Sequence, residues 1–314
     1  MTRRATASAG HPRRREVACA TTVADVTKTT FQIAGRTVGR VGYGAMQLPG
    51  PGVFGPPRDH DEAVAVLRRA VDAGVNHIDT AQYYGPDVSN ELIHEALHPY
   101  HDDLVIVSKV GGARDDRGGW LPAQTPVELR SGVEANLRTL ELEQLGAVNL
   151  RVMDPDESSG ERGVALDDQL AEMVTLRDEG KIAGIGISNA SLAAVDTAIE
   201  WAQITCVQNP YSLVAQDDGG VLERCIAAGI AFVPFFPLGS AFPNMPKVID
   251  DEAVRAVADR IAATPAQVGL AWLLRRADNI LLIPGTSSLV HLEENLAVRN
   301  VTLSDADLAE LDDR

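Results

Sequence analysis

The chain has few cysteines: only Cys19, Cys206 and Cys225 occur among its 314 residues. They show no C-x-x-C spacing and accompany no histidine cluster. This argues against a structural zinc site and is typical of proteins in the reducing cytosol. Long apolar runs are also missing, since none reaches the roughly 20 residues that a membrane helix needs. We therefore expect a cytoplasmic protein with no bound metal ion and no membrane partner.

Positive charge is scarce as well. The 28 lysines and arginines face 44 aspartates and glutamates, which gives a net charge of −16. Binding to nucleic acid needs clustered cations against phosphate, so this balance argues against a nucleic-acid partner. Apolar residues make up 45 % of the chain, enough for a large core. We expect a monomer or small homo-oligomer that acts on a small molecule.

Residues 1–28 differ from the rest of the sequence. They have few large apolar residues and no apolar h-region, so they do not form a secretory signal. This composition predicts a disordered basic N-terminal tail. The alternatives are a start site placed too far upstream or a functional basic arm. The tail's arginines are Arg3, Arg4, Arg13, Arg14 and Arg15.

From residue 29 onward the sequence alternates short apolar runs with amphipathic segments. "FQIAGRTV" predicts a small hairpin that turns near Ala34-Gly35. Eight runs then follow without strict alternation, as in strands buried on both faces of a parallel sheet. Eight strand–helix units in series predict one (β/α)₈ TIM barrel over residues 29–314. The runs are Val41–Gly44, Val75–Asp79, Leu104–Lys109, Ala147–Met153, Ile182–Ile187, Ile204–Gln208, Ala231–Phe236 and Ile280–Ile283.

Two nucleotide-binding signatures are missing. An open doubly wound sheet, the alternative fold, would carry a glycine-rich turn after its first strand. Gly42 and Gly44 do not continue as G-x-G-x-x-G, and no GK[ST] phosphate loop is present. Helix starts are marked instead by capping boxes with a proline at the first helical position, at Thr125 and Thr264. These signals favour the barrel.

In a barrel the chemistry lies at the carboxyl ends of the strands. Asp79 ends the second run, Tyr84 follows in the loop, and Lys109 ends the third run. Neighbouring strands lie about 5 Å apart, so these side chains can converge. A lysine beside a phenol would lower the tyrosine pKa, and such a tyrosine can exchange a proton with a carbonyl oxygen. Turn chemistry alone is the other interpretation of "NHIDTAQYYG".

The motifs "HIDTAQYYG", "VIVSK", "GIGISN", "VQNPYS" and "LLIPGTSSLVHLEENL" resemble, in this order, those of the aldo-keto reductase family. The resemblance covers residues 29–314. "VGYGAMQLPGPGVFGPPRD" and "VPFFPLG" are further similar to the branch that interconverts pyridoxal and pyridoxine. The resemblance implies reversible hydride transfer from NAD(P)H to an aldehyde carbonyl, with pyridoxal as the expected substrate. Other aldehydes or ketones, or a low-turnover NADP(H)-binding sensor or accessory subunit, are the alternatives.

The resemblance also implies a set of site residues. Asp79, Tyr84 and Lys109 match the catalytic aspartate, tyrosine and lysine, and Tyr211 matches an aromatic that stacks on the nicotinamide. Met46, Phe54 and Trp120 lie on loops suited to contact the substrate, although simple loop packing is an equal alternative. The other expected cofactor contacts are Gly44, Met46, Ser188, Asn189, Gln208, Phe236, Pro237, Leu238, Gly239, Ser240, Thr286, Ser287, His291, Glu294 and Asn295.

Two positions depart from the family pattern. Arg151 stands where many members have a fourth catalytic residue, a histidine. It either assists the substrate oxygen or pairs with an acid such as Asp154. Gly285 and His291 stand where members that prefer NADPH often have lysine and arginine. Without these two fixed cations, the protein should bind the 2′-phosphate of NADPH more weakly. NADPH remains the expected cofactor, and NADH is not excluded.

Overall fold

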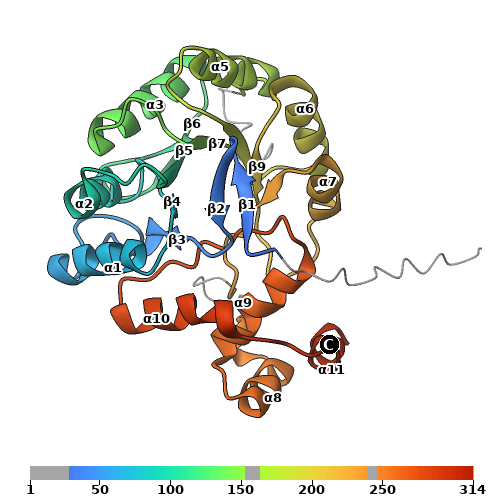
Figure 1. The fold of residues 1–314 in the computed structure, drawn as a ribbon. Helices are drawn as coiled ribbons and strands as arrows, with labels where there is room; N and C mark the ends of the chain where they lie inside the picture. Colours follow the sequence, from blue (N-terminus) through green and yellow to red (C-terminus); the bar gives the residue numbers. More distant parts are fainter. Residues whose placement is uncertain (1–27, 153–162, 240–245, 314) are drawn as a thin grey trace, which may run out of the picture.

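A computed structural model describes residues 28–152, 163–239 and 246–313. Residues 1–27 of the predicted basic tail, Asp154 and Ser240 lie outside these ranges. The central sheet is parallel, and its strands follow one another in chain order around a ring (Figure 1). The strands are β3 (Tyr43–Gly44), β4 (His77–Asp79), β5 (Val105–Arg114), β7 (Ala147–Arg151), β8 (Ile185–Ser188), β9 (Cys206–Gln208) and β10 (Ala231–Phe232).

The eighth apolar run closes the ring. Ile280 bridges to Phe232 of β10, and on the other side Gly285 bridges to Gly44 of β3. Main-chain hydrogen bonds run from Leu281 N to Phe232 O (2.9 Å) and from Gly42 N to Leu282 O (2.8 Å). The predicted (β/α)₈ barrel is therefore confirmed, with isolated bridges in place of a long eighth strand.

Helices surround the strands as an outer ring (Figure 1). The predicted capping boxes at Thr125 and Thr264 are both present, and each opens its helix with a proline. Three short 3₁₀ helices, η1 (Ala45–Gln47), η2 (Val248–Asp250) and η3 (Val298–Asn300), complete the connections. The α-helices are α1 (His60–Asp72), α2 (Val88–Leu97), α3 (Pro126–Leu140), α5 (Leu166–Asp178), α6 (Leu192–Ala202), α7 (Val221–Ala228), α8 (Glu252–Ile261), α9 (Pro265–Arg276), α10 (Leu289–Ala297) and α11 (Asp305–Asp312). Within the described ranges no helix combines the length and apolar character needed to cross a membrane.

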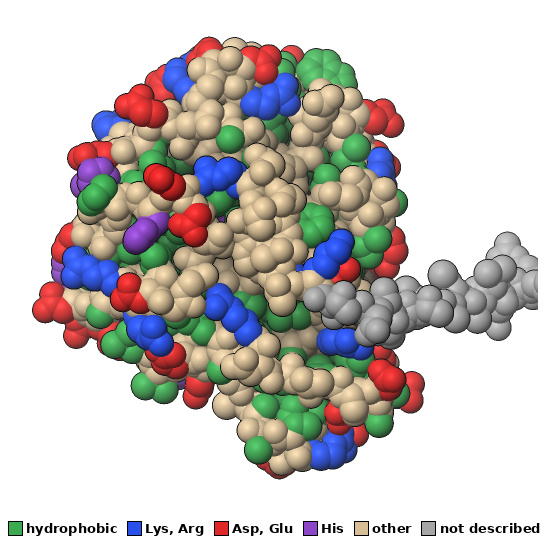
Figure 2. Space-filling view, viewed as in Figure 1, with side chains coloured by type: hydrophobic (Ala, Val, Ile, Leu, Met, Phe, Trp, Pro, Cys, Tyr) green, Lys and Arg blue, Asp and Glu red, His purple; other side chains and the backbone are tan. Residues whose placement is uncertain are grey.

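The predicted hairpin is present as β1 (Thr30–Ile33) and β2 (Arg36–Gly39). Ala34 and Gly35 both have positive φ, as a two-residue turn matched to the strand twist requires. Ile33 and Val38 are fully buried against side chains inside the barrel. The hairpin lies across the barrel centre in Figure 1, and Figure 2 shows acidic and basic side chains interspersed on this face. The hairpin therefore covers the amino-terminal mouth, and the carboxyl ends of the strands face the opposite side.

One strand was not predicted from the sequence. β6 (Trp120–Ala123) runs antiparallel to the end of β5, with Arg114 opposite Trp120 and Gly111 opposite Ala123. Trp120 and Leu121 are exposed, so β6 lacks the apolar pattern of a barrel strand. The pair extends β5 beyond the barrel and carries Trp120 to the edge of the site.

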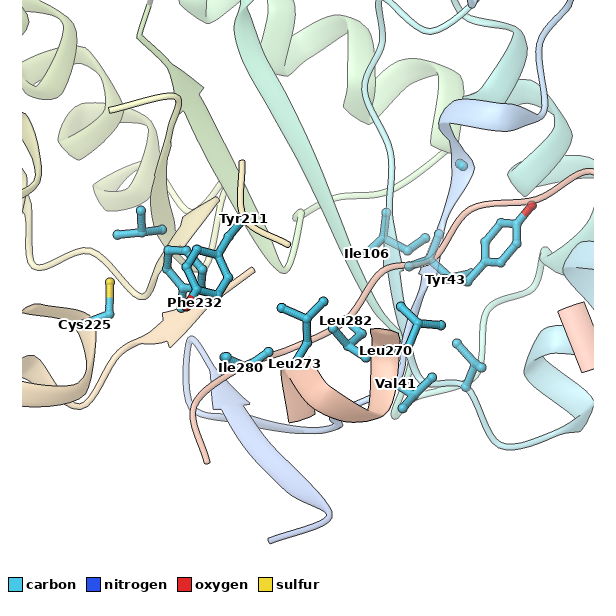
Figure 3. Close-up of a cluster of buried hydrophobic side chains, with 14 of the residues drawn as sticks. Val41, Tyr43, Ile106, Tyr211, Cys225, Phe232, Leu270, Leu273, Ile280 and Leu282 are labelled. Atoms are coloured by element: carbon cyan, nitrogen blue, oxygen red, sulfur yellow. The ribbon is translucent and has the colours of Figure 1, made fainter. Parts of the chain in front are cut away.

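The main core lies between the strands and the helices. It includes fully buried Phe232 and Trp272 and nearly buried Tyr211. Figure 3 shows Tyr211 and Phe232 side by side within this cluster. Their ring centroids are 5.7 Å apart at an angle of 89°, an edge-to-face contact.

Candidate active site

The centre of the site is a buried ion pair between two neighbouring strands. Lys109 Nζ donates a hydrogen bond to Asp79 Oδ1 and another, of 3.1 Å, to Thr80 O. Gln208 Nε2 donates to the second oxygen, Asp79 Oδ2, at 2.8 Å. Asp79 and Lys109 are only 3 % and 5 % exposed. Both charges are therefore paired and hydrogen-bonded, as burial requires.

Tyr84 packs against this pair, as predicted. Lys109 Nζ lies 5.1 Å from the centre of the Tyr84 ring, and the ring is buried. Burial raises the pKa of Tyr84 above its ordinary value of 10; the Asp79 charge raises it further and the Arg151 charge lowers it. The predicted lowering of the Tyr84 pKa by a neighbouring cation is therefore wrong, because loss of hydration outweighs the Arg151 charge. The phenol therefore stays protonated at neutral pH and can act as a proton donor.

A cavity of about 530 Å³ opens over these side chains. It is lined by Asp79, Tyr84, Lys109 and several aromatic side chains, by the loop after β10, and by residues that follow the eighth run. The lining contains these predicted site residues: Gly44, Met46, Asp79, Tyr84, Lys109, Trp120, Arg151, Gln208, Phe236, Pro237, Leu238, Gly239 and Asn295.

Ser188 ends β8 and Asn189 follows it, and neither residue is part of the cavity lining. The Ser188 hydroxyl and Gln208 Oε1 are both buried, and neither has a hydrogen-bond partner among the described residues. Asn189 Nδ2 instead donates to Val152 O at 3.1 Å. Two buried polar atoms thus remain available beside the ion pair, and Asn189 is engaged in holding the loop after β7.

The structure places Tyr211 differently from the expectation. Its ring stacks on Trp272, with centroids 6.1 Å apart, and it does not line the cavity. Phe235 lines the cavity, and its ring lies edge-to-face on that of Phe236. Sequence reasoning missed Phe235, although it lies just after β10 in "VPFFPLG", where a barrel places its site residues.

The residues expected to contact the adenosine phosphate surround the start of α10. Thr286 is buried, and its hydroxyl accepts a hydrogen bond from Ser288 N at 3.0 Å. Ser287 and His291 are exposed, and Glu294 is partly buried. These four residues lie outside the cavity lining. A helix start offers free N–H groups and a favourable dipole to an anion.

The missing lysine at position 285 has a steric reason. A Cβ atom on Gly285 would lie 2.6 Å from Gly44 O, because the eighth run approaches β3 closely at this bridge. Any side chain here requires a backbone shift, so the close pairing that closes the barrel favours glycine.

Arg151 ends β7 and lines the cavity. Within the described ranges its guanidinium forms no ion pair with an acidic side chain, and Asp154 is not among the described residues. The Arg151 main chain is fixed, because Gln124 Nε2 donates to its carbonyl at 3.1 Å. The strand therefore presents a cation at the position where the family pattern has histidine.

Phe54 and Trp120 are linked through Arg114. The guanidinium carbon lies 3.9 Å from the centre of the Trp120 ring and 5.6 Å from that of Phe54. Trp120 reaches the cavity, whereas Phe54 does not line it. The expectation of a substrate contact thus fits the position of Trp120, and Phe54 packs in the supporting layer.

One histidine grouping lies away from the cavity. His94, His98 and Glu141 bring three potential ligand atoms within 4.8 Å of one another, near the ends of α2 and α3. His98 and Glu141 are exposed. Their spacing in the sequence gave no sign of this grouping, which the fold alone creates.

Comparisons with known proteins agree with this geometry. Residues 40–314 match the model of the aldo/keto reductase family. The chain is 47 % identical over 287 residues to a pyridoxine 4-dehydrogenase of Escherichia coli, covering 91 % of this chain and 98 % of the relative. It is 35 % identical to an uncharacterized oxidoreductase of Schizosaccharomyces pombe, over 90 % of this chain and 89 % of that one.

Solved structures share the fold. A thermostable aldo-keto reductase in complex with the inhibitor epalrestat superposes with a TM-score of 0.75 at 27 % identity, covering 90 % of this chain and 98 % of that one. An aldo/keto reductase of Klebsiella pneumoniae in complex with NADP and acetate gives a TM-score of 0.74 at 24 % identity, covering 91 % and 95 %.

Proposed function

Because the chain belongs to the aldo/keto reductase family, we propose that it is a cytosolic NADPH-dependent reductase that converts pyridoxal into pyridoxine. The observation that carries the chemistry is the Asp79–Lys109 ion pair packed against the buried ring of Tyr84. The relative called pyridoxine 4-dehydrogenase, 47 % identical over nearly its whole length, supports the choice of substrate.

The site has groups that fit a dinucleotide. Gln208 Oε1 and the Ser188 hydroxyl are buried without partners among the described residues, and a carboxamide would satisfy both. Phe235 would contact the nicotinamide ring, and the Phe236–Gly239 loop would run along the pyrophosphate. Asn295 and the start of α10 would hold the adenosine phosphate. When bound, the reduced nicotinamide supplies the hydride.

The protein's own part in the reaction is proton delivery. The aldehyde carbon gains a hydride and its oxygen gains the proton of the Tyr84 hydroxyl, which yields the alcohol. Lys109 places a positive charge beside the ring, where it stabilises the phenolate that remains. Asp79 holds the Lys109 ammonium in position through their hydrogen bond. Solvent then returns a proton to Tyr84, and the reverse sequence oxidises the alcohol.

A turnover assay tests this proposal. The loss of NADPH absorbance is followed with pyridoxal and with a panel of other aldehydes, and the product is identified by chromatography. We expect pyridoxal to be reduced to pyridoxine with the highest kcat/KM of the panel. NADPH binding with no oxidation by any aldehyde would contradict the proposal, as would a strong preference for an unrelated aldehyde.

A further inference from the structure

Among the described residues, the cavity lining carries one positive charge that no acidic side chain balances. Its lining contains a single aspartate, Asp79, which is paired with Lys109. The lining tyrosines, Tyr83 and Tyr84, are buried and neutral. Arg151 remains, and within the described ranges no acidic side chain pairs with it. A guanidinium facing a partly enclosed cavity favours an anionic oxygen, to which it can donate two hydrogen bonds.

Tyr83 provides a second, independent observation. It lines the same cavity and is 3 % exposed, and its hydroxyl has no partner among the described residues. The ring is fixed edge-to-face between Tyr84 and Trp120, with both centroid distances at 5.5 Å. A buried hydroxyl without a partner is costly, so this atom indicates a polar group on the ligand.

Arg151 interacts electrostatically with both Tyr83 and Tyr84. The Arg151 charge lowers the pKa of both Tyr83 and Tyr84, although burial raises both by more. Tyr84 already has a role at the carbonyl oxygen, which leaves Tyr83 and Arg151 for a second oxygen beside it. Trp120 and Phe235 add flat aromatic surface to the same cavity.

From these observations we infer that Arg151 and Tyr83 form a subsite for an anionic ring oxygen on the carbon next to the one that bears the aldehyde. The inference rests on the proposed function and defines its substrate class as flat aromatic aldehydes with an ionised ortho hydroxyl. Pyridoxal belongs to this class, since its ring hydroxyl neighbours its aldehyde. Arg151 then selects the substrate through this second oxygen, while Tyr84 alone donates to the carbonyl.

A pair of small aldehydes tests the subsite. 3-Hydroxypyridine-4-carboxaldehyde has the ring oxygen and pyridine-4-carboxaldehyde lacks it. We expect the wild-type kcat/KM to favour the hydroxylated aldehyde by about 10- to 100-fold, as a charge-assisted hydrogen bond provides. Arg151→Met should bring this ratio close to one, Arg151→Lys should restore part of it, and Tyr83→Phe should lower it by about five- to tenfold. Arg117→Met, which removes an exposed arginine from the loop between β5 and β6, should leave the ratio unchanged.

Two results would overturn the inference. If Arg151→Met lowers kcat/KM equally for both aldehydes, Arg151 acts on the carbonyl oxygen instead. If the wild-type ratio is already near one, no such subsite exists. Calorimetry can measure binding of the corresponding alcohols in the presence of NADPH, which cannot reduce them. This tests the subsite without any turnover. Tighter binding of the hydroxylated alcohol, lost in Arg151→Met, would support the subsite even if neither aldehyde is reduced; equal binding would contradict it.

Discussion

At the scale of single residues, the protonation of the site is set by burial more than by charge. Tyr84 has a lysine and an arginine nearby, yet its pKa lies above the ordinary value because the ring has lost its hydration. Under the proposed mechanism, Lys109 therefore serves less to create a resting phenolate than to stabilise the negative charge that would appear on the Tyr84 oxygen during proton transfer.

His77 predicts a dependence of stability on pH. It is fully enclosed two residues before Asp79, and burial lowers its pKa from 6.5 to about 4, with Asp79 opposing and Lys109 adding to the shift. Between about pH 4 and pH 6.5, His77 is therefore neutral in the folded protein but protonated in the unfolded chain. Stability conferred by neutral His77 is complete above pH 6.5 and is lost progressively as pH falls toward 4, by roughly 3 kcal/mol.

Urea unfolding across this pH interval measures the effect. His77→Asn should show a smaller loss of unfolding free energy on acidification than the wild type, because the substituted amide does not titrate. His101→Asn, which changes an exposed histidine, should retain the full wild-type loss. If the unfolding free energy falls equally with pH in His77→Asn and in the wild type, His77 is not buried in its neutral form.

His291 offers a test of the cofactor assignment. It lies exposed in the first turn of α10, where the adenosine phosphate is proposed to bind. His291→Arg supplies a permanent cation, so NADPH should bind about five- to tenfold tighter, while NADH, which lacks the 2′-phosphate, should change little. Fluorescence titration with both cofactors measures this. A parallel gain for both would place the 2′-phosphate elsewhere.

At the scale of elements, a buried polar network ties the strands that hold the Asp79–Lys109 ion pair to the helices outside them. Thr80 Oγ1 donates to Asn90 Oδ1 at 2.9 Å, and Asn90 Nδ2 donates to Asn136 Oδ1 at 2.9 Å. Ser108 Oγ also donates to Asn136. Thr80 and Ser108 are chain neighbours of Asp79 and Lys109. Helices α2 and α3 thereby fix the two strands that hold the ion pair.

Removing the centre of this network should be costly. Asn136→Ala removes the acceptor of the Ser108 hydroxyl and one of the two acceptors of the Asn90 amide, the other being Thr139 Oγ1, so we expect a loss of about 2–4 kcal/mol in unfolding free energy. Asn300→Ala, at an exposed position, should stay within about 0.5 kcal/mol of wild type. Urea unfolding of both variants measures these losses. Equal losses of unfolding free energy in Asn136→Ala and Asn300→Ala would mean that the network adds no stability.

The elements also show how far sequence reasoning reaches. The barrel strands and capping boxes could be predicted because each has a local cause, an apolar run or a reciprocal cap. β6 could not, because its residues are exposed and it is defined only by pairing with β5. Tyr211 and Phe235 both follow strand ends, and only the packing on Trp272 shows that Tyr211 faces the core. The direction of the Tyr84 pKa likewise depends on burial that no motif encodes.

At the scale of the whole molecule, the hairpin that closes the barrel and the cavity with its polar side chains lie at opposite ends of the barrel. The hairpin of β1 and β2 covers one mouth of the barrel with Ile33 and Val38. At the other end, β4, β7 and β9 each end in a polar side chain that lines one cavity, and Lys109 of β5 lines it too. Closure of the ring at the Gly44–Gly285 bridge brings the residues that follow the eighth run to the same cavity as the Asp79–Lys109 ion pair.

The most direct test of this account compares two neighbouring tyrosines with pyridoxal and NADPH. For Tyr84→Phe we predict a fall in kcat of at least about 100-fold, as loss of the general acid entails, with NADPH binding unchanged. Tyr83→Phe should lower kcat/KM by about five- to tenfold and remain catalytically active. Near-normal turnover by Tyr84→Phe, or inactivity of Tyr83→Phe instead, would contradict the assignment of Tyr84 as the proton donor.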